Sequence, residues 1–270
     1  MDNAPSPEAV VRVTVFAGVF LVIAVVETLQ PWRPSLRRER WTANLLLFAI
    51  GAVALRLVFP AAAVGLALFA NARGWGLLPA LGLPAPVAAT LAFIGLDAII
   101  WAQHRLFHHV PWLWRLHRVH HTDTALDLTT GLRFHPLEIL FSMLIKAAAV
   151  VALGAPAVAV LAFEIALSST ALFNHANLRL PAALDRALRL VLVTPAMHRV
   201  HHSWHGEETN SNFGFNLPWW DRAFGTYTAE SRDGPTSLTI GLREFREPAA
   251  GRCLALLLQP FRTPTQTVNA

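Results

Sequence analysis

The chain has 270 residues, of which 54% are hydrophobic and only 14% are charged. A soluble globular protein carries about 25% charged residues, so this composition favours a membrane protein. The net charge of +5 comes almost entirely from arginines beside apolar segments, where positive charge sets membrane topology; we expect no nucleic-acid partner. The only cysteine, Cys253, excludes an internal disulfide and a cluster of thiolate metal ligands.

Five apolar segments follow one another along the chain, and a helix needs about 20 such residues to cross a bilayer. The last two are short for a full crossing, and the Gly-Ala-Pro sequence at 154–156 predicts a tight turn between them. Pro60 predicts a kink inside the second segment. Without an internal repeat or a linker, residues 1–270 should form one domain, an all-α, integral-membrane helical bundle with a cap. The expected spans are residues 10–29, 42–70, 87–103, 137–153 and 156–173, and the expected cap is residues 104–136 and 174–230.

The arginines predict which span ends face the cytosol. Four arginines lie in the loop 31–41, whereas the connection after the second span has only Arg73. Because positively charged loops stay in the cytosol, the loop 31–41 should be cytosolic. Alternating five spans from there puts the N-terminus outside, and the cap and the C-terminus in the cytosol; Arg12, near the outer end of the first span, is an exception. The compact multi-pass chain is typical of the bacterial inner membrane. Its start, MDNAPSPEAVV, lacks the basic region of a cleaved signal peptide, so the first span should be retained.

The histidines are the strongest functional signal, because all twelve lie between His104 and His205. Residues three and four apart share a helix face, so histidines at this spacing can point at one metal. Eight such imidazoles exceed the four ligands that one zinc usually takes, and they predict two metals close together. Nitrogen ligands suit iron, zinc, copper or nickel, so ligand type alone does not select the metal. The eight are His104 and His108 in HRLFH, His117, His120 and His121 in the first HRVHH, and His198, His201 and His202 in the second.

Four further histidines have weaker claims. His175 follows the last apolar segment and returns to the same surface, so we expect it to be the ninth ligand. His135 and His205 are possible additional ligands. His109 would point about 100° away from His108 on a helix, which argues against it.

Several polar residues could support the ligands, because a metal-bound histidine usually donates its other N–H to a carboxylate or carbonyl. Asp97 lies seven residues before His104 on the same helix face, although it could equally pair with Arg56. Asp123 follows the second histidine motif by two residues. Asp127, just after the same motif, is a candidate alongside Asp123, whereas Glu138, Asn174 and Asn212 have less support.

The ordered motifs HRLFH, WRLHRVHHTD, RFHPLE, NHANLRLP and TPAMHRVHHS resemble those of the fatty acid hydroxylase superfamily, which includes sterol desaturases. The tail NFGFNLPWWDRAFGTY is similar to that family's segment after the last histidine motif, and the resemblance covers residues 30–230. It implies a helical membrane fold whose cytosolic cap holds two iron ions, with zinc as a possible substitute. It also implies O2-dependent hydroxylation or desaturation of a C–H bond in a lipid such as a fatty acyl chain or a sterol. The ligand positions carried over from the family are His104, His108, His117, His120, His121, His175, His198, His201 and His202.

Such chemistry needs electrons, and the chain has no glycine fingerprint for a flavin or dinucleotide, so a separate reductase or electron carrier is implied. The apolar substrate would enter from the bilayer. Two alternatives stay open. The same metal chemistry could end in desaturation or in cleavage of an ether lipid, or the chain could be a membrane metal-binding protein or transporter without oxygenase activity. A transporter should carry ionisable ligands near the middle of its spans, whereas these histidines gather at span ends.

Lys146 and Glu164 are charged residues within the last two apolar segments. They lie nine residues before and nine residues after Ala155, the centre of the expected turn. At 1.5 Å per residue, both should sit roughly 13 Å from the turn, so antiparallel helices would bring them level as an ion pair. Alternatively, Lys146 reaches toward the membrane surface or Glu164 lines the substrate cavity.

Overall fold

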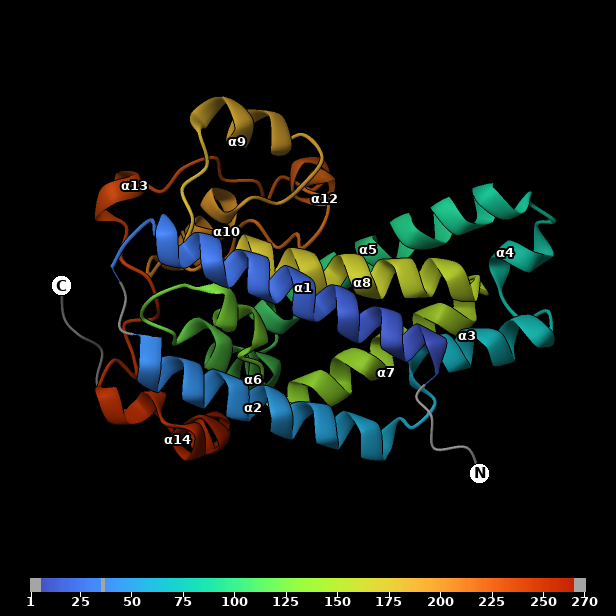
Figure 1. Ribbon diagram of the computed structural model, residues 1–270, viewed down its shortest axis with the longest axis horizontal. Helices are drawn as coiled ribbons and strands as arrows, with labels where there is room; N and C mark the ends of the chain where they lie inside the picture. Colours follow the sequence, from blue (N-terminus) through green and yellow to red (C-terminus); the bar gives the residue numbers. More distant parts are fainter. Residues whose placement is uncertain (1–5, 35–36, 265–270) are drawn as a thin grey trace.

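The computed structural model describes residues 6–34 and 37–264, and within them the only regular elements are helices. Long helices lie side by side along the molecule, and most of the short helices gather at one end, with α4 at the other (Figure 1). Both chain ends and the middle of the arginine-rich loop, for which the sequence predicts a side of the membrane, lie outside the described residues. The all-α fold class is confirmed.

Five stretches of the described chain are long and apolar enough to cross a membrane, and their number equals that of the predicted spans. The second stretch contains three helices, and each of the others is a single helix. The helices are α1 (Pro7–Leu29), α2 (Arg37–Val58), α3 (Ala62–Ala72), α4 (Leu77–Ala80), α5 (Ala85–His109), α7 (Pro136–Leu153) and α8 (Ala157–Asn174).

Two helix boundaries differ from the sequence prediction. Pro60 lacks an N–H and cannot continue a helix, and it separates α2 from α3 completely rather than kinking one helix. Helix α5 runs six residues past its predicted end at 103, until Val110, which precedes Pro111 and is pushed out of helical geometry. The first histidine pair, His104 and His108, therefore lies on the last turns of a long helix and not in a separate cap segment.

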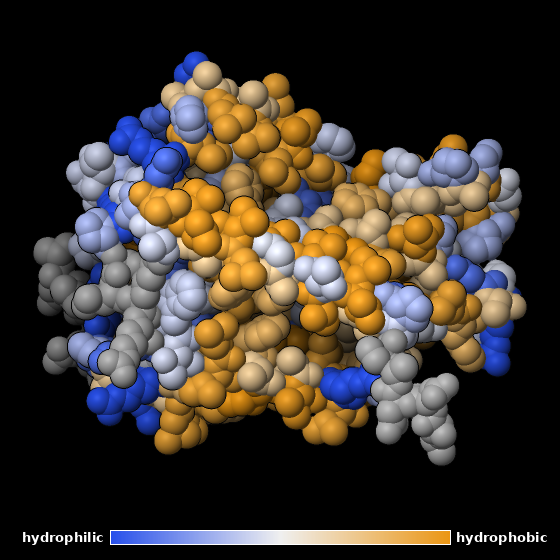
Figure 2. Space-filling model, in the orientation of Figure 1, coloured by the Kyte–Doolittle hydropathy of each residue, from blue (hydrophilic) through white to orange (hydrophobic). Residues whose placement is uncertain are grey.

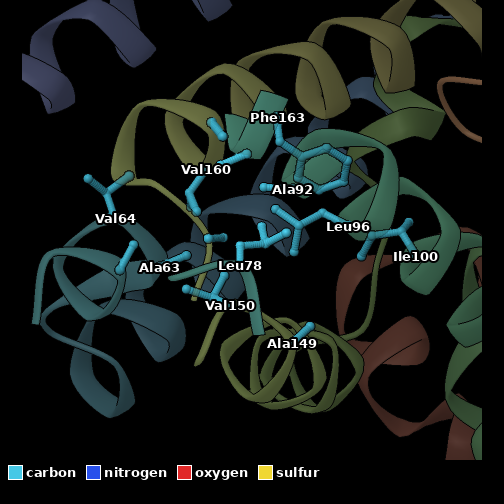
Figure 3. Packing of buried hydrophobic residues seen from close by; sticks show 14 of the residues in the cluster. Ala63, Val64, Leu78, Ala92, Leu96, Ile100, Ala149, Val150, Val160 and Phe163 are labelled. Atoms are coloured by element: carbon cyan, nitrogen blue, oxygen red, sulfur yellow. The ribbon is translucent and has the colours of Figure 1, made fainter. Parts of the chain in front are cut away.

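The long helices enclose an apolar core of mostly small side chains (Figure 3). Helix α1 packs on α8, and α2 packs on α7. Alanines such as Ala63 and Ala92 are fully buried between the helices. Such small side chains let the helix backbones approach closely, as in membrane helix bundles. Gly154 closes α7 at a φ of 62°, and an added Cβ would lie 2.2 Å from the carbonyl oxygen of Trp75. The α7–α8 turn thus requires glycine.

The outer faces of α1 and α2 are apolar, and Figure 2 shows this hydrophobic surface beside a more hydrophilic end at the cap. Val13, Leu21 and Leu57 are 67%, 63% and 77% exposed. Contiguous apolar surface of this kind is expected where a bundle faces lipid.

The cap consists of short helices that cover this hydrophilic end of the bundle (Figure 1). The cap elements are α6 (Pro111–His121), η1 (Leu128–Leu132), α9 (Ala182–Leu188), α10 (Pro195–His201), α11 (Gly206–Thr209), α12 (Trp219–Ala223), α13 (Gly234–Ser237), η2 (Pro248–Gly251), α14 (Cys253–Leu258) and η3 (Gln259–Phe261). The cap also includes residues beyond 230, where the predicted cap ended, because Leu256 of α14 packs in one cluster with Leu47 of α2 and Val119 of α6.

Candidate metal centre

Nine imidazoles converge where the cap meets the bundle, and they are the nine that the sequence singled out. They form two groups, and within each group one ligand nitrogen per histidine lies within 4.8 Å of the others. The first group, here called site A, is His104, His108, His117, His121 and His201; the second, site B, is His120, His175, His198 and His202.

The two sites share their helices. The HRVHH helix α6 sends His117 and His121 to site A and His120 to site B. The second HRVHH sequence, in and after α10, sends His201 to site A and its two other histidines to site B. The i+3 and i+4 spacing therefore does not aim three imidazoles at one point; it divides each motif between two neighbouring points.

The nitrogen spacing fits a metal ion in each site. The Nε2 atoms of His104 and His117 are 3.0 Å apart, and those of His175 and His120 are also 3.0 Å apart. With metal–nitrogen distances of about 2.1 Å, neighbouring ligand nitrogens are expected about 3.0–3.4 Å apart. Buried ring nitrogens without a hydrogen-bond partner among the described residues, such as Nε2 of His201 and both nitrogens of His108, point to the same conclusion.

Outward hydrogen bonds fix which ring nitrogen carries the proton. Nδ1 of His104 donates to the Phe213 carbonyl at 2.7 Å, and Nδ1 of His117 donates to the Glu138 carboxylate at 2.6 Å. The two Nε2 atoms that face each other at 3.0 Å then both carry a lone pair and no proton. Two such lone pairs repel each other unless a cation lies between them. His175 and His201 likewise donate from Nδ1 to carbonyls, those of Ala171 and Ser211, and have Nε2 free for a metal.

Burial keeps the cap histidines that belong to sites A and B neutral. It lowers the pKa of His117 to about 3 and the pKa of His175 to about 4. Burial, followed by repulsion from the neighbouring imidazoles, lowers the pKa of the other cap histidines in both sites well below the usual value; these are His120, His121, His198, His201 and His202. Neutral imidazole is the form that binds a metal.

Asp221 supports this arrangement from outside the histidines. Its carboxylate accepts hydrogen bonds from the backbone N–H groups of Phe213 and Gly214, at 2.9 and 2.8 Å, and from the indole of Trp101. It thereby holds the peptide whose carbonyl accepts the His104 proton. Sequence reasoning missed Asp221 because it acts through a backbone carbonyl and not on a histidine directly. The signal was present, since the motif NFGFNLPWWD contains Phe213, Gly214 and Asp221.

The weaker histidine candidates lie outside both sites. His135 caps α7: its Nδ1 accepts from the Leu137 N–H and its Nε2 donates to the Leu257 carbonyl, each at 3.2 Å. His205 is bonded through Nε2 to Asp233 at 2.6 Å. His109 is exposed, and its Nδ1 donates to the carbonyl of the preceding turn.

Asp97 and Asp123 form hydrogen bonds with scaffold residues rather than with the histidines. Asp97 accepts from Trp220 and Asn216, at 2.8 and 2.9 Å, and pairs with neither a histidine nor Arg56. Asp123 accepts two hydrogen bonds of 2.7 Å from Arg40. Burial alone would raise the pKa of Asp123, but the adjacent guanidinium groups hold it well below its usual range.

The remaining weak candidates have mixed outcomes. Glu138 touches a site A histidine as predicted. Asp127 instead caps η1 and pairs with Arg40 at 2.6 Å. Asn174 and Asn212 donate to backbone carbonyls and contact no histidine through a hydrogen bond in the described chain.

A cavity of about 260 Å³ opens beside site A between α5, α7 and α8. His104, His117 and Glu138 line it, together with apolar residues such as Met143 and Leu167. An apolar hollow that reaches two candidate ligands is the form expected of a lipid-chain site.

Charged residues also line this cavity. Lys146 and Glu164 both lie on its wall, and Nζ of Lys146 is 2.5 Å from a Glu164 oxygen. The predicted ion pair is confirmed, and so is the alternative that Glu164 lines a cavity. Arg12, whose position was unexplained in the sequence, contacts the second oxygen of Glu164 at 3.0 Å.

Comparison with known proteins agrees with this geometry. A sequence model described as fatty acid hydroxylase matches residues 89–226, which include all nine histidines of sites A and B. The chain belongs to the fatty acid hydroxylase family. This confirms the family recognised from the histidine motifs. No solved structure matches the chain.

The relatives in this family are lipid hydroxylases and monooxygenases. The ornithine lipid hydroxylase OlsE of Rhizobium tropici is 30% identical over 92% of this chain and 74% of its own length. The cholesterol 25-hydroxylase of Homo sapiens is 26% identical over 85% of this chain and 86% of its own length. The alkylglycerol monooxygenase of Homo sapiens is 30% identical over 57% of this chain, and the match spans only 34% of that longer protein. These relatives support an oxidoreductase that hydroxylates a lipid.

Proposed function

We propose that this family member is an O2-dependent di-iron enzyme that hydroxylates a C–H bond of a membrane lipid, with desaturation as the closest variant outcome. The observation that carries the proposal is the convergence of nine imidazoles into two sites beside an apolar cavity. Sites A and B would hold one iron each. The two irons would supply the activation of O2 and the oxidation of an unactivated C–H bond.

The chain's own residues would bind and orient the substrate. A lipid chain in the cavity would lie against His104 and His117, next to site A. Phe107, Phe134 and Phe215 line the same cavity and would exclude water from the reacting carbon. Glu138 holds the Nδ1 proton of His117, which keeps that imidazole in the form that binds metal.

The location of the sites argues against a transporter. Both lie at one end of the bundle, under the cap, whereas a transporter would hold its ions near the middle of the spans. We propose that residues 1–270 act as one membrane domain, with the cap on the cytosolic side of a bacterial inner membrane. There it would meet a separate electron-donating reductase or carrier.

The test is metal content and product formation on the purified protein. We expect about two irons per chain, with zinc as a substitute after overexpression, and a hydroxylated lipid that is missing from cells without the gene. The double variant His121→Ala/His202→Ala removes one ligand from each site, and it should lose both iron and product. His109→Ala is the matched control, because His109 lies on α5 outside both sites. Normal iron content and activity in the double variant would end the di-iron proposal.

A further inference from the structure

The charged cluster in the cavity, Arg12, Lys146 and Glu164, is far from the histidines. Lys146 is seven residues from the end of α7 and Glu164 is seven residues from the start of α8, so both lie roughly 10 Å below the α7–α8 turn. Arg12 is five residues from the start of α1, on the same side of the bundle. Glu138, at the site A end of the cavity, is eight residues from Lys146 along α7, which is roughly 12 Å.

Counted over the described residues, the cluster of Arg12, Lys146 and Glu164 carries one more positive than negative charge. Glu164 is 4% exposed in its side chain, and each of its oxygens contacts one cation. Two cations share this one carboxylate, and Lys146 is only 13% exposed. Glu138, the other acid on the cavity wall in the part of the chain that the structure describes, is bonded to His117 at the opposite end.

An excess cation within a membrane segment is costly unless an anion compensates it. The cluster faces a cavity and not a closed helix contact, so a ligand can supply that anion. Lys146 has three N–H donors and Arg12 has five, more than one carboxylate can accept. The surplus donors suit the oxygens of a carboxylate or phosphate.

We propose that this cluster binds the anionic end of the lipid substrate, so that the substrate is an acyl chain bearing a carboxylate or a phosphate. This inference rests on the proposed function and names its substrate class. The anionic end would lie on the side away from the cap, and the chain would run along the cavity toward site A. A span of roughly 12 Å corresponds to on the order of ten carbon–carbon bonds, so the oxidised carbon would be well inside the chain and not at the head group.

The test is a comparison of three ligands with the same chain length: dodecanoate, dodecyl phosphate and dodecanol. Each is titrated into the purified protein in neutral detergent at pH 8, and affinity is read from the rise in the thermal unfolding midpoint. At least one anion should bind about tenfold more tightly than the alcohol, as expected for a charge-assisted hydrogen bond. The anion that does so tells whether carboxylate or phosphate is the natural group.

Two variants separate a binding role from a structural one. Lys146→Met removes a cation and should weaken binding of the anion about tenfold. Glu164→Gln removes the competing carboxylate and should strengthen it, whereas a merely structural cluster would make both variants bind worse. Arg56→Met is the control, because Arg56 bonds to the Pro60 carbonyl and does not line the cavity.

Equal affinity for the anions and the alcohol in the unaltered protein would overturn the proposal, as would weaker anion binding in Glu164→Gln. The comparison of ligands on the unaltered protein decides the matter even if Lys146→Met fails to fold. Binding is measured without turnover, so this failure would leave the oxygenase proposal intact. Conversely, absence of iron and of product would end the oxygenase proposal whatever the anion affinity.

Discussion

Acidification should destabilise the metal-free protein steeply between pH 7 and pH 5. Burial lowers the pKa of His117 to about 3 and that of His175 to about 4, whereas an unfolded chain titrates near 6.5. Below pH 6.5 the unfolded chain therefore takes up protons that the folded chain does not. Stability is full above the unfolded pKa, and it is lost progressively as the pH falls toward the folded pKa.

The size of the loss follows from these two pKa values. Each histidine should cost about 1.4 kcal/mol per pH unit once the pH is below 6.5. From pH 7 to pH 5 the cost is about 2 kcal/mol for His117 and about the same for His175, or about 4 kcal/mol together. A whole domain is stable by only about 5–15 kcal/mol, so two residues alone would remove a large share. Five other cap histidines shift in the same direction.

The assay is thermal unfolding in neutral detergent at pH 7, 6 and 5, with chelated and with iron-loaded protein at constant ionic strength. The chelated protein should lose many degrees between pH 7 and pH 5, and the loaded protein should release iron over the same range. The variant His117→Gln should show a shallower pH dependence, and His109→Ala an unchanged one. An unfolding midpoint of the chelated protein that is the same at pH 5 and pH 7 would refute the reasoning, because buried neutral imidazoles must give this dependence.

Two further outcomes follow from the described contacts, and a third follows from the charge of the arginine-rich loop. In a double-mutant cycle, Glu164→Gln should cost about 1–3 kcal/mol more stability than Lys146→Met. The Gln variant leaves two cations unpaired, whereas the Met variant leaves the Glu164 carboxylate paired with Arg12. Strictly additive losses in detergent would contradict the ion pair. Glu138→Gln should lower iron affinity about 10- to 100-fold, measured by competition with a chelator, and unchanged affinity would mean that the carboxylate does not support its imidazole partner. Reporter fusions at the chain end and in the α4–α5 loop should report the cytosolic and the outer side respectively, and a reversed pattern would show that the arginine-rich loop was misread.

Much of this arrangement could be predicted because it is local in the sequence. Apolar length predicted the spans, and i, i+3 and i+4 spacing identified the histidines that converge. The equal distances of Lys146 and Glu164 from the turn predicted their pairing, since antiparallel helices of equal rise must bring such residues level.

The rest depended on contacts between distant segments. The division of each HRVHH motif between two sites follows from how α6 and α10 face each other, which spacing alone does not determine. Arg40 was read as a topology-setting surface charge, but it is bonded to Asp123 and Asp127 and ties α2 to the cap. The carbonyl partners of the ligand histidines belong to the backbone, and no side chain in the sequence identifies them.

Because each HRVHH motif contributes histidines to both sites, binding of one metal should depend on binding of the other. A metal in site A would fix α6 and α10 against each other through His117, His121 and His201, and the same two elements carry three of the four imidazoles of site B. Filling the first site would therefore already order most of the second, so the second metal would bind with a smaller loss of conformational entropy. Loading should be cooperative: at limiting iron, a mixture of empty and doubly loaded chains would form, with few chains holding a single ion. For the same reason, a substitution that displaces one HRVHH helix should weaken metal binding at both sites.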